Sequence, residues 1–209
     1  MDIKQTIQRP FSYVQYNFTV ILIIINLVVF LITRISQNAI AYLAMQPLLV
    51  NNGFIWTFLS YMFVHASAGH ILFNMVGLFI FGTQVEQEMG SWEFLFFYLI
   101  TGVLAGVFSY VVYVASGQYY IFLVGASGAL YGVMLAFATY YPNARVFILG
   151  LIPVRSVTLV IIFTVFAIFN QITGLNGSVA HMTHLAGLLF AFLYFIIRLG
   201  INPLHKWRR

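Results

Sequence analysis

The sequence predicts an all-α membrane protein, a single domain over residues 1–209 built as a bundle of six transmembrane helices. Of the 209 residues, 62% are hydrophobic and only 6% are charged, whereas soluble domains contain about 25% charged residues. The aromatic content of 18% is the opposite of the signature of a disordered chain. The apolar residues also form long runs, and a helix needs about 20 of them to cross a bilayer core of about 30 Å.

Six apolar stretches fit, or nearly fit, the length of a membrane-spanning helix. The predicted spans are 17–33, 68–86, 92–114, 127–141, 156–173 and 180–199. Residues 35–67 instead mix Asn, Gln and Ser with scattered aromatic side chains, which is typical of chain lying in the membrane interface. We therefore expect a membrane-embedded first loop there, with His65 as an interfacial residue.

The distribution of Lys and Arg predicts the orientation. With six spans and both termini in the cytoplasm, only Arg34 lies outside, which is a strong positive-inside pattern. The eight basic residues on the cytoplasmic side are then Lys4, Arg9, Arg145, Arg155, Arg198, Lys206, Arg208 and Arg209. We expect a multi-pass protein of the cell (inner) membrane, and we attribute the net charge of +5 to topology and not to nucleic-acid binding.

Composition also argues against several function classes. The interior of each span contains no Asp, Glu, Lys or Arg, since Glu86 and Glu93 lie at span ends, and this disfavours proton-coupled transporters and pumps. The absence of Cys excludes thiol catalysis and thiolate metal sites. His181 and His184 could hold a metal ion with His70, but no carboxylate is near to complete a zinc site. We expect neither metal nor cofactor; a haem ligated by His70 and His184 is an alternative that a Soret band would reveal.

The fourth span is too short to cross the membrane completely. Its 15 residues, Ser127 to Tyr141, make about 22 Å of helix. With Arg145 at the cytoplasmic surface, Ser127 begins the helix inside the membrane, and Gly125 and Gly128 let the preceding chain turn there. Non-helical chain at that depth requires surrounding protein or a water-filled cavity. The sequence therefore predicts a recessed aqueous pocket at Ser127.

Three helices bring polar side chains to this depth. His184 lies about one turn into the sixth span, and His70 and Asn74 lie one turn apart on one face of the second. A histidine base can activate a serine hydroxyl, so Ser127 and His184 form a candidate dyad, with no acid at this depth to make a triad. The Asn74 amide, the His70 ring and the Ser127 backbone N–H are donors of the type that stabilises an oxyanion.

Small residues indicate how the helices approach one another. A Gly-xxx-Gly pattern begins at Gly128 and a Gly-xxx-Ala pattern at Gly187, and both allow close contact of helix backbones in lipid. His184 shares a face with Gly187, so this contact directs its ring towards the fourth helix. Tyr131, one turn after Ser127, is then placed to stack on the imidazole.

Together these motifs resemble those of the rhomboid intramembrane serine proteases, over about residues 50–195. The matching elements are Gly125-Ala126-Ser127-Gly128 for the GxSG signature, His70 with Asn74 for the His-xxx-Asn element, His184 with Gly187 for the element of the catalytic histidine, and Gly82, Glu86 and Gly90 for a Gly-xxx-Glu-xxx-Gly run.

The resemblance implies that Ser127 is the nucleophile, that His184 is the general base, and that His70 and Asn74 are oxyanion donors. It implies membrane lipids as surroundings and single-pass membrane proteins as substrates, cut near the outer leaflet where a helix unwinds easily. It leaves the oligomeric state open. The alternative is a catalytically inactive rhomboid-like scaffold that binds transmembrane clients, which the intact Ser127–His184 pair disfavours.

The resemblance also assigns the surroundings of the site. It implies that residues 174–179 form a flexible cap and that Phe163 and Phe166 are lateral-gate residues. One departure is Trp56-Thr57, where the family often has Trp-Arg; it leaves open how the first loop is anchored.

Overall fold

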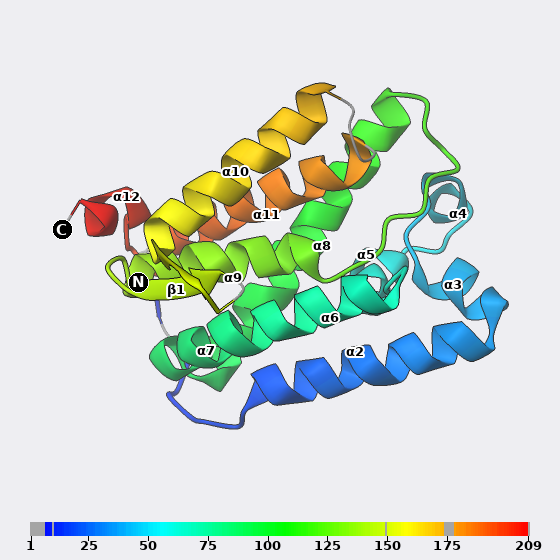
Figure 1. Cartoon of the computed structure of the whole chain (residues 1–209). Coiled ribbons are helices and arrows are strands. Elements are labelled where there is room, and N and C mark those ends of the chain that lie inside the picture. Colours follow the sequence, from blue (N-terminus) through cyan, green and yellow to red (C-terminus); the bar gives the residue numbers. More distant parts are fainter. Residues whose placement is uncertain (1–6, 10, 149, 174–177, 209) are drawn as a thin grey trace.

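The computed structural model describes residues 7–9, 11–148, 150–173 and 178–208. Long helices run side by side along one direction (Figure 1). They are α2 (Phe18–Ile35), α8 (Ser91–Ala115), α9 (Ser127–Tyr140), α10 (Ser156–Thr173), α11 (Ser178–Ile197), and a continuous helical run of α6 (Ala68–Gly77), the π-helical η2 (Leu78–Gly82) and α7 (Thr83–Met89). The helix ends lie within three residues of the predicted spans.

Shorter elements connect these helices. The segment between α2 and α6 folds into α3 (Gln37–Leu43), α4 (Pro47–Asn51), α5 (Thr57–Ser60) and the 3-10 turn η1 (Tyr61–Phe63), and α12 (Pro203–Trp207) follows α11. The described chain also contains a feature that an all-α prediction omits, the antiparallel hairpin of β1 (Arg145–Ile148) and β2 (Ile152–Arg155). Its strands are rich in β-branched residues, which favour extended chain, and Gly150 supplies a positive φ of 74° in the turn.

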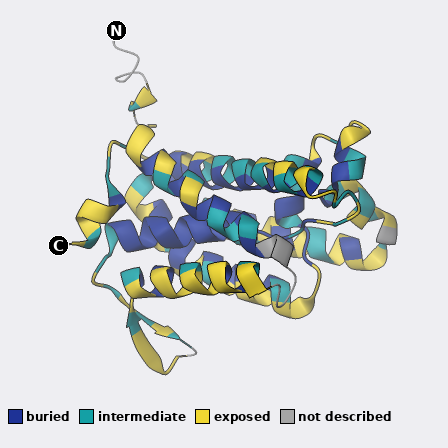
Figure 2. Cartoon of the chain, turned by 90° about the horizontal axis from the view of Figure 1, so that it is seen from above, coloured by how far each residue is buried: buried dark blue, intermediate teal, exposed yellow. Residues whose placement is uncertain are grey.

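Helix α9 is the centre of the bundle. Every residue from Gly128 to Thr139 is buried, and Figure 2 shows this helix surrounded by partly exposed ones. Among the described residues, four helices are long and apolar enough to cross a membrane, namely α2, the α6–α7 run, α8 and α10. Helix α9 and the described part of α11 are shorter apolar helices. The six-span prediction is therefore supported by length for four helices and stays a prediction for the other two.

The buried Glu86 caps the N-terminus of α2 from the neighbouring α7. Asn17, which precedes α2, makes no side-chain cap, and α2 has no acid in its first turn, so its free N–H groups need an acceptor from elsewhere. Glu86 accepts the N–H of Phe18 at 2.7 Å, and the N–H and hydroxyl of Thr19 at 2.8 and 2.7 Å. The hydroxyl of Ser91 also donates to it. One carboxylate thus ties α2, α7 and α8 together.

A second buried acid, Glu93, joins the two ends of the described chain. Arg198 forms an ion pair with Glu93 at 3.0 Å and donates to the carbonyl of Ile7 at 2.5 Å. The hydroxyl of Tyr194 donates to Glu93 as well. Both chain ends therefore lie at one end of the bundle (Figure 1), whereas Arg34 lies in the last turn of α2, at the other end.

We expect the substitution Glu86→Gln to destabilise the protein by about 2–3 kcal/mol, because an amide N–H₂ would replace an acceptor that faces several donors. Unfolding in mixed detergent micelles measures this loss. Glu88→Gln is the matched control, because among the described residues the exposed Glu88 accepts a side-chain hydrogen bond from the Tyr141 hydroxyl alone, at 2.5 Å; it should cost less than about 1 kcal/mol. Equal losses in both variants would contradict the capping role of Glu86.

Candidate active site

Backbone hydrogen bonds hold the chain that leads into α9 against the first loop. Met45 and Leu123 form an antiparallel bridge with N–H to O distances of 3.1 and 2.7 Å. The N–H of Gly125 donates to the carbonyl of Tyr61 at 3.0 Å. These contacts fix where Ser127 begins the helix, and its own N–H is one of the first-turn donors that have no partner within the helix.

Gly125 allows the ring of His70 to lie directly against this chain. The φ of Gly125 is +115°, and a Cβ built there would lie 2.7 Å from Cε1 and Nε2 of His70 and 3.8 Å from Oγ of Ser127. The backbone N–H of His70 donates to Ser67 Oγ at 3.1 Å, which caps α6. Because no side chain stands between them, the imidazole of His70 and the hydroxyl of Ser127 face the same small space.

Ser127 and His184 come together from α9 and α11. The distance from Ser127 Oγ to His184 Nε2 is 2.8 Å. The ring of Tyr131 stacks on the imidazole of His184, with centroids 4.3 Å apart and an interplanar angle of 9°. The other ring nitrogen, Nδ1 of His184, is buried with no hydrogen-bond partner among the described residues. The pair therefore consists of a hydroxyl and a base, and no described carboxylate bonds to the other nitrogen of that base.

The backbones of α9 and α11 touch beside this pair. A Cβ built on Gly187 would lie only 1.9 Å from the carbonyl oxygen of Gly128. One turn further along α9, a Cβ on Gly132 would lie 3.1 Å from that of Ala191. Thr183, one turn before Gly187 on the same face of α11, shares a hydrogen bond of 2.7 Å with Ser109 of α8. Helix α11 is thus tied to both α8 and α9.

Asn74 lies one turn below His70 and lines the same cavity as Ser127. Its amide Nδ2 donates one N–H to the carbonyl of His70 at 2.8 Å. The second N–H of this amide can then donate to another acceptor. The amide oxygen is buried with no partner among the described residues. An amide held in this way is available to a group that enters the cavity.

The cavity has a volume of about 600 Å³ and extends away from Ser127 along α9. Its walls come from α6, η2, α9 and α10 and include Phe163, and its far end is lined by Val146 and Ile148 of the hairpin. Phe163 also packs edge-on against Tyr131, with centroids 6.0 Å apart. Phe166 contacts His181 instead, edge-on at 6.5 Å. Most of the lining is apolar, and the polar groups lie at the Ser127 end.

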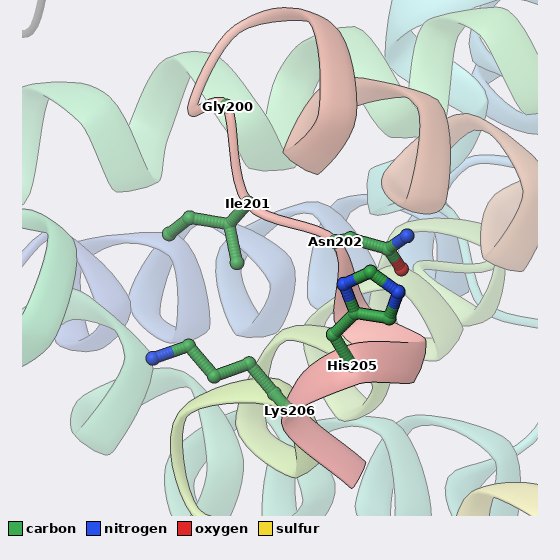
Figure 3. A pocket seen from close by; sticks show the side chains of 5 residues that line it. All are labelled: Gly200, Ile201, Asn202, His205 and Lys206. Carbon is green, nitrogen blue, oxygen red and sulfur yellow. The ribbon is translucent and has the colours of Figure 1, made fainter. Parts of the chain in front are cut away.

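A second hollow, of about 310 Å³, lies at the C-terminal turn. Figure 3 shows the side chains of Asn202, His205 and Lys206 around it. Asn202 is occupied as the cap of α12, because its Oδ1 accepts the N–H of Leu204 at 3.0 Å. This hollow lacks a nucleophile and a buried base, so the candidate site is the cavity at Ser127.

Sequence reasoning missed one residue next to the site. His65, expected at the interface, is 2% exposed, and its ring lies 5.0 Å from that of His70, edge-on. Burial, together with the neighbouring His70, lowers the pKa of His65 to about 4, so this ring is neutral at physiological pH. The spacing of five residues between the two histidines is a weak signal, because it depends on the turn between η1 and α6.

The first loop is anchored without an arginine at position 57. Thr57 is buried and donates to the carbonyl of Phe54, within its own turn, at 2.6 Å. Two neighbouring side chains bond to residues further away in the sequence. Trp56 Nε1 donates to the carbonyl of Tyr42 at 2.8 Å, and the Ser60 hydroxyl donates to the carbonyl of Leu43 at 2.7 Å. Of the predicted cap at 174–179, residues 174–177 lie outside the described residues.

Residues 52–201 match the family model of the Rhomboid domain. The chain is 28% identical over 190 residues to the rhomboid protease GlpG of Haemophilus influenzae, covering 88% of this chain and 94% of that protein. It is 26% identical over 195 residues to the rhomboid protease GluP of Bacillus subtilis, covering 90% and 36%. It is also 34% identical over 140 residues to the mitochondrial presenilin-associated rhomboid-like protein of Rattus norvegicus, covering 63% and 35%.

We expect Gly187→Ala to destabilise the protein by about 3 kcal/mol, at the upper end for overpacking, because the new methyl group would meet a backbone carbonyl that cannot rotate away. Thermal unfolding in detergent measures it. Gly69→Ala is the control, since a Cβ at Gly69 meets nothing within 4 Å. Wild-type stability of Gly187→Ala would show that α9 and α11 are not in backbone contact.

Proposed function

This chain belongs to the rhomboid family, and on that premise we propose that it is an intramembrane serine endopeptidase that cuts single-pass membrane proteins in or near their transmembrane segments. The chain is an integral membrane protein, and relatives such as GlpG and GluP carry the name of rhomboid protease. The observation that carries the proposal is the 2.8 Å hydrogen bond between Ser127 Oγ and His184 Nε2.

The first step is attack by Ser127 on the scissile carbonyl carbon. As the C–O bond forms, His184 Nε2 takes the hydroxyl proton and the carbonyl π electrons move to the oxygen. His184 must therefore carry its other proton on Nδ1, the nitrogen that faces no acid. Stacking on Tyr131 fixes the plane of the imidazole, which supplies part of the orientation that a carboxylate gives in a triad.

The oxyanion that forms needs donors already in place. The backbone N–H of Ser127 lies at the N-terminus of α9, where the helix dipole favours negative charge. The second amide N–H of Asn74 and a ring N–H of His70 complete the set. His184 then gives its proton to the leaving amine and the C–N bond breaks. Water attacks the acyl group on Ser127 with His184 again as base, the ester bond to Ser127 Oγ breaks, and His184 returns the proton to that oxygen.

The cavity supports a transmembrane segment as the substrate. It starts at Ser127 and continues along α9 between α6 and α10, with apolar walls. A substrate helix must unwind beside Ser127, because only an extended backbone exposes its carbonyl carbon to the hydroxyl. We assign Phe163 and Phe166 to the lateral entrance between α6 and α10.

The same proposal includes the arrangement in the membrane. We infer six spans in one domain, with α9 and α11 as the two short ones and residues 35–67 as a first loop embedded in the outer interface. The meeting of the two described chain ends supports an even number of crossings. Arg34 at the opposite end supports termini in the cytoplasm, and we place the protein in the cell (inner) membrane.

The alternative function is a catalytically inactive member of the family that binds transmembrane clients. An inactive scaffold would bind its clients in the same cavity, but it would not need the hydrogen bond between Ser127 and His184. The two are separated by whether a transmembrane reporter is cut, and by whether the cut depends on Ser127.

We expect the purified protein in liposomes to cleave a single-pass transmembrane reporter and Ser127→Ala to show only background, because losing the nucleophile of a serine protease costs about 10⁶-fold in kcat. Gel or mass-spectrometric detection of the products measures this. Ser116→Ala is the matched control, because Ser116 donates only within α8. Equal cleavage by wild type and Ser127→Ala would sink the assignment of the nucleophile, and intact reporter with both would favour the inactive scaffold.

We expect Asn74→Ala to lower kcat for the same reporter by about 10²–10³-fold with little change in KM, because a donor to the oxyanion acts in the transition state. Steady-state cleavage in liposomes measures both constants. Asn52→Ala is the control, because the exposed Asn52 also donates to a carbonyl four residues earlier, at 2.8 Å, but lies away from the cavity. An undiminished kcat in Asn74→Ala would exclude the oxyanion role.

A further inference from the structure

The β1–β2 hairpin exposes apolar side chains at the end of the bundle where the two described chain ends meet. Phe147, Leu151 and Ile152 are 59%, 80% and 61% exposed. Figure 2 shows the hairpin projecting sideways from the bundle, beyond the helices. In the strand register, Phe147 and its partner Pro153 lie on the same face as Arg145 and Arg155, whereas Ile152 pairs with Ile148 on the opposite face. Val146, Phe147 and Ile148 also border the cavity that begins at Ser127. An exposed apolar surface of this kind on an integral membrane protein is suited to contact with lipid.

Two arginines face each other at the base of the same hairpin. The register pairs Arg145 with Arg155, and both are exposed. Like charges directly opposite in a strand pair destabilise it, and the Cα atoms of such a pair are only about 5 Å apart. A negative charge between or beside the two guanidinium groups would relieve this repulsion.

The described chain supplies no such charge. Its one ion pair within 4 Å joins Glu93 and Arg198, so no described carboxylate pairs with either hairpin arginine. Glu86 is buried and occupied by donors from α2 and Ser91. The remaining described acid, Glu88, accepts the hydroxyl of Tyr141. Any fixed counter-charge for these two arginines therefore lies outside the described residues.

We propose that Arg145 and Arg155 together bind the phosphate of an anionic phospholipid in the leaflet on the side of the chain ends, while Phe147, on the same face, and Leu151, at the tip, lie among its acyl chains. Guanidinium groups bind phosphate oxygens through paired N–H donors. The order of side chains from base to tip, charged and then apolar, matches the order of a lipid from headgroup to acyl chain. A free phosphate would satisfy the arginines alone and leave the apolar residues uncovered.

Lipid retention measured by native mass spectrometry tests this proposal. The wild type and R145Q/R155Q are each equilibrated with phosphatidylglycerol or phosphatidylcholine in detergent. We expect R145Q/R155Q to bind phosphatidylglycerol at least about 10-fold more weakly than the wild type, because charge-assisted hydrogen bonds from both guanidinium groups to the phosphate are lost. Binding of phosphatidylcholine, whose choline cation already neutralises its phosphate, should change little, which also shows that the variant is folded.

The matched control is K206Q/R208Q, which removes the same charge from the same end of the bundle without touching the hairpin. It should bind phosphatidylglycerol like the wild type. If it loses as much affinity as R145Q/R155Q, or if R145Q/R155Q loses none, the paired site is overturned.

A second measurement keeps the test independent of the stability of R145Q/R155Q. The chain contains no Cys, so Leu151→Cys provides a single position for a fluorescent label. In vesicles of phosphatidylglycerol with brominated acyl chains, we expect the label to be quenched more strongly than a label at Leu204→Cys, a position in α12. Equal or weaker quenching at Leu151 would show that the hairpin does not enter the bilayer. Neither readout depends on protease activity.

Discussion

The close contact of α9 with α11 is the constraint on which the candidate site depends. Because neither Gly128 nor Gly187 has a side chain, the backbone of α11 lies against a carbonyl of α9, with no room for one carbon between them. That contact brings His184, less than one turn before Gly187, to 2.8 Å from Ser127. The hydrogen bond between Ser109 and Thr183, which lies on the same face of α11 as Gly187, also ties α11 to α8. In lipid, where apolar surfaces gain little from meeting each other, such close packing and buried hydrogen bonds stabilise a bundle.

The burial of α9 explains how a helix of only 14 residues can carry this site. At about 21 Å it is shorter than a bilayer core, but its neighbours surround it. Gly125 and Ala126, directly before Ser127, are buried, and the chain there finds backbone partners in the first loop. The positive φ of Gly125 and the missing Cβ there let His70 lie against that chain. The backbone turn at Gly125 thus determines both the depth of Ser127 and the position of His70.

The sequence predicted those features that hydrophobic length and helix geometry determine by themselves. Apolar runs of about 20 residues predicted the helices, and the short fourth run predicted a recessed Ser127 with His70, Asn74 and His184 at similar depth; the structure places all four around one space. The hairpin was missed because the run from Arg145 to Arg155 is short and apolar, and such a run does not distinguish strand from helix or loop by period. The burial of His65 was missed because it depends on the packing of the first loop onto α6. The catalytic roles themselves rest on geometry and family membership.

Labelling with a fluorophosphonate tests the central claim, that His184 makes Ser127 a nucleophile, without requiring the physiological substrate. The wild type and His184→Ala are treated in liposomes and the modified residue is identified by peptide mass spectrometry. The account predicts an adduct on Ser127 in the wild type and a loss of at least about 10³-fold in labelling rate in His184→Ala, because the hydroxyl then has no base. Equal labelling of the two proteins, or an adduct at another residue, would contradict it.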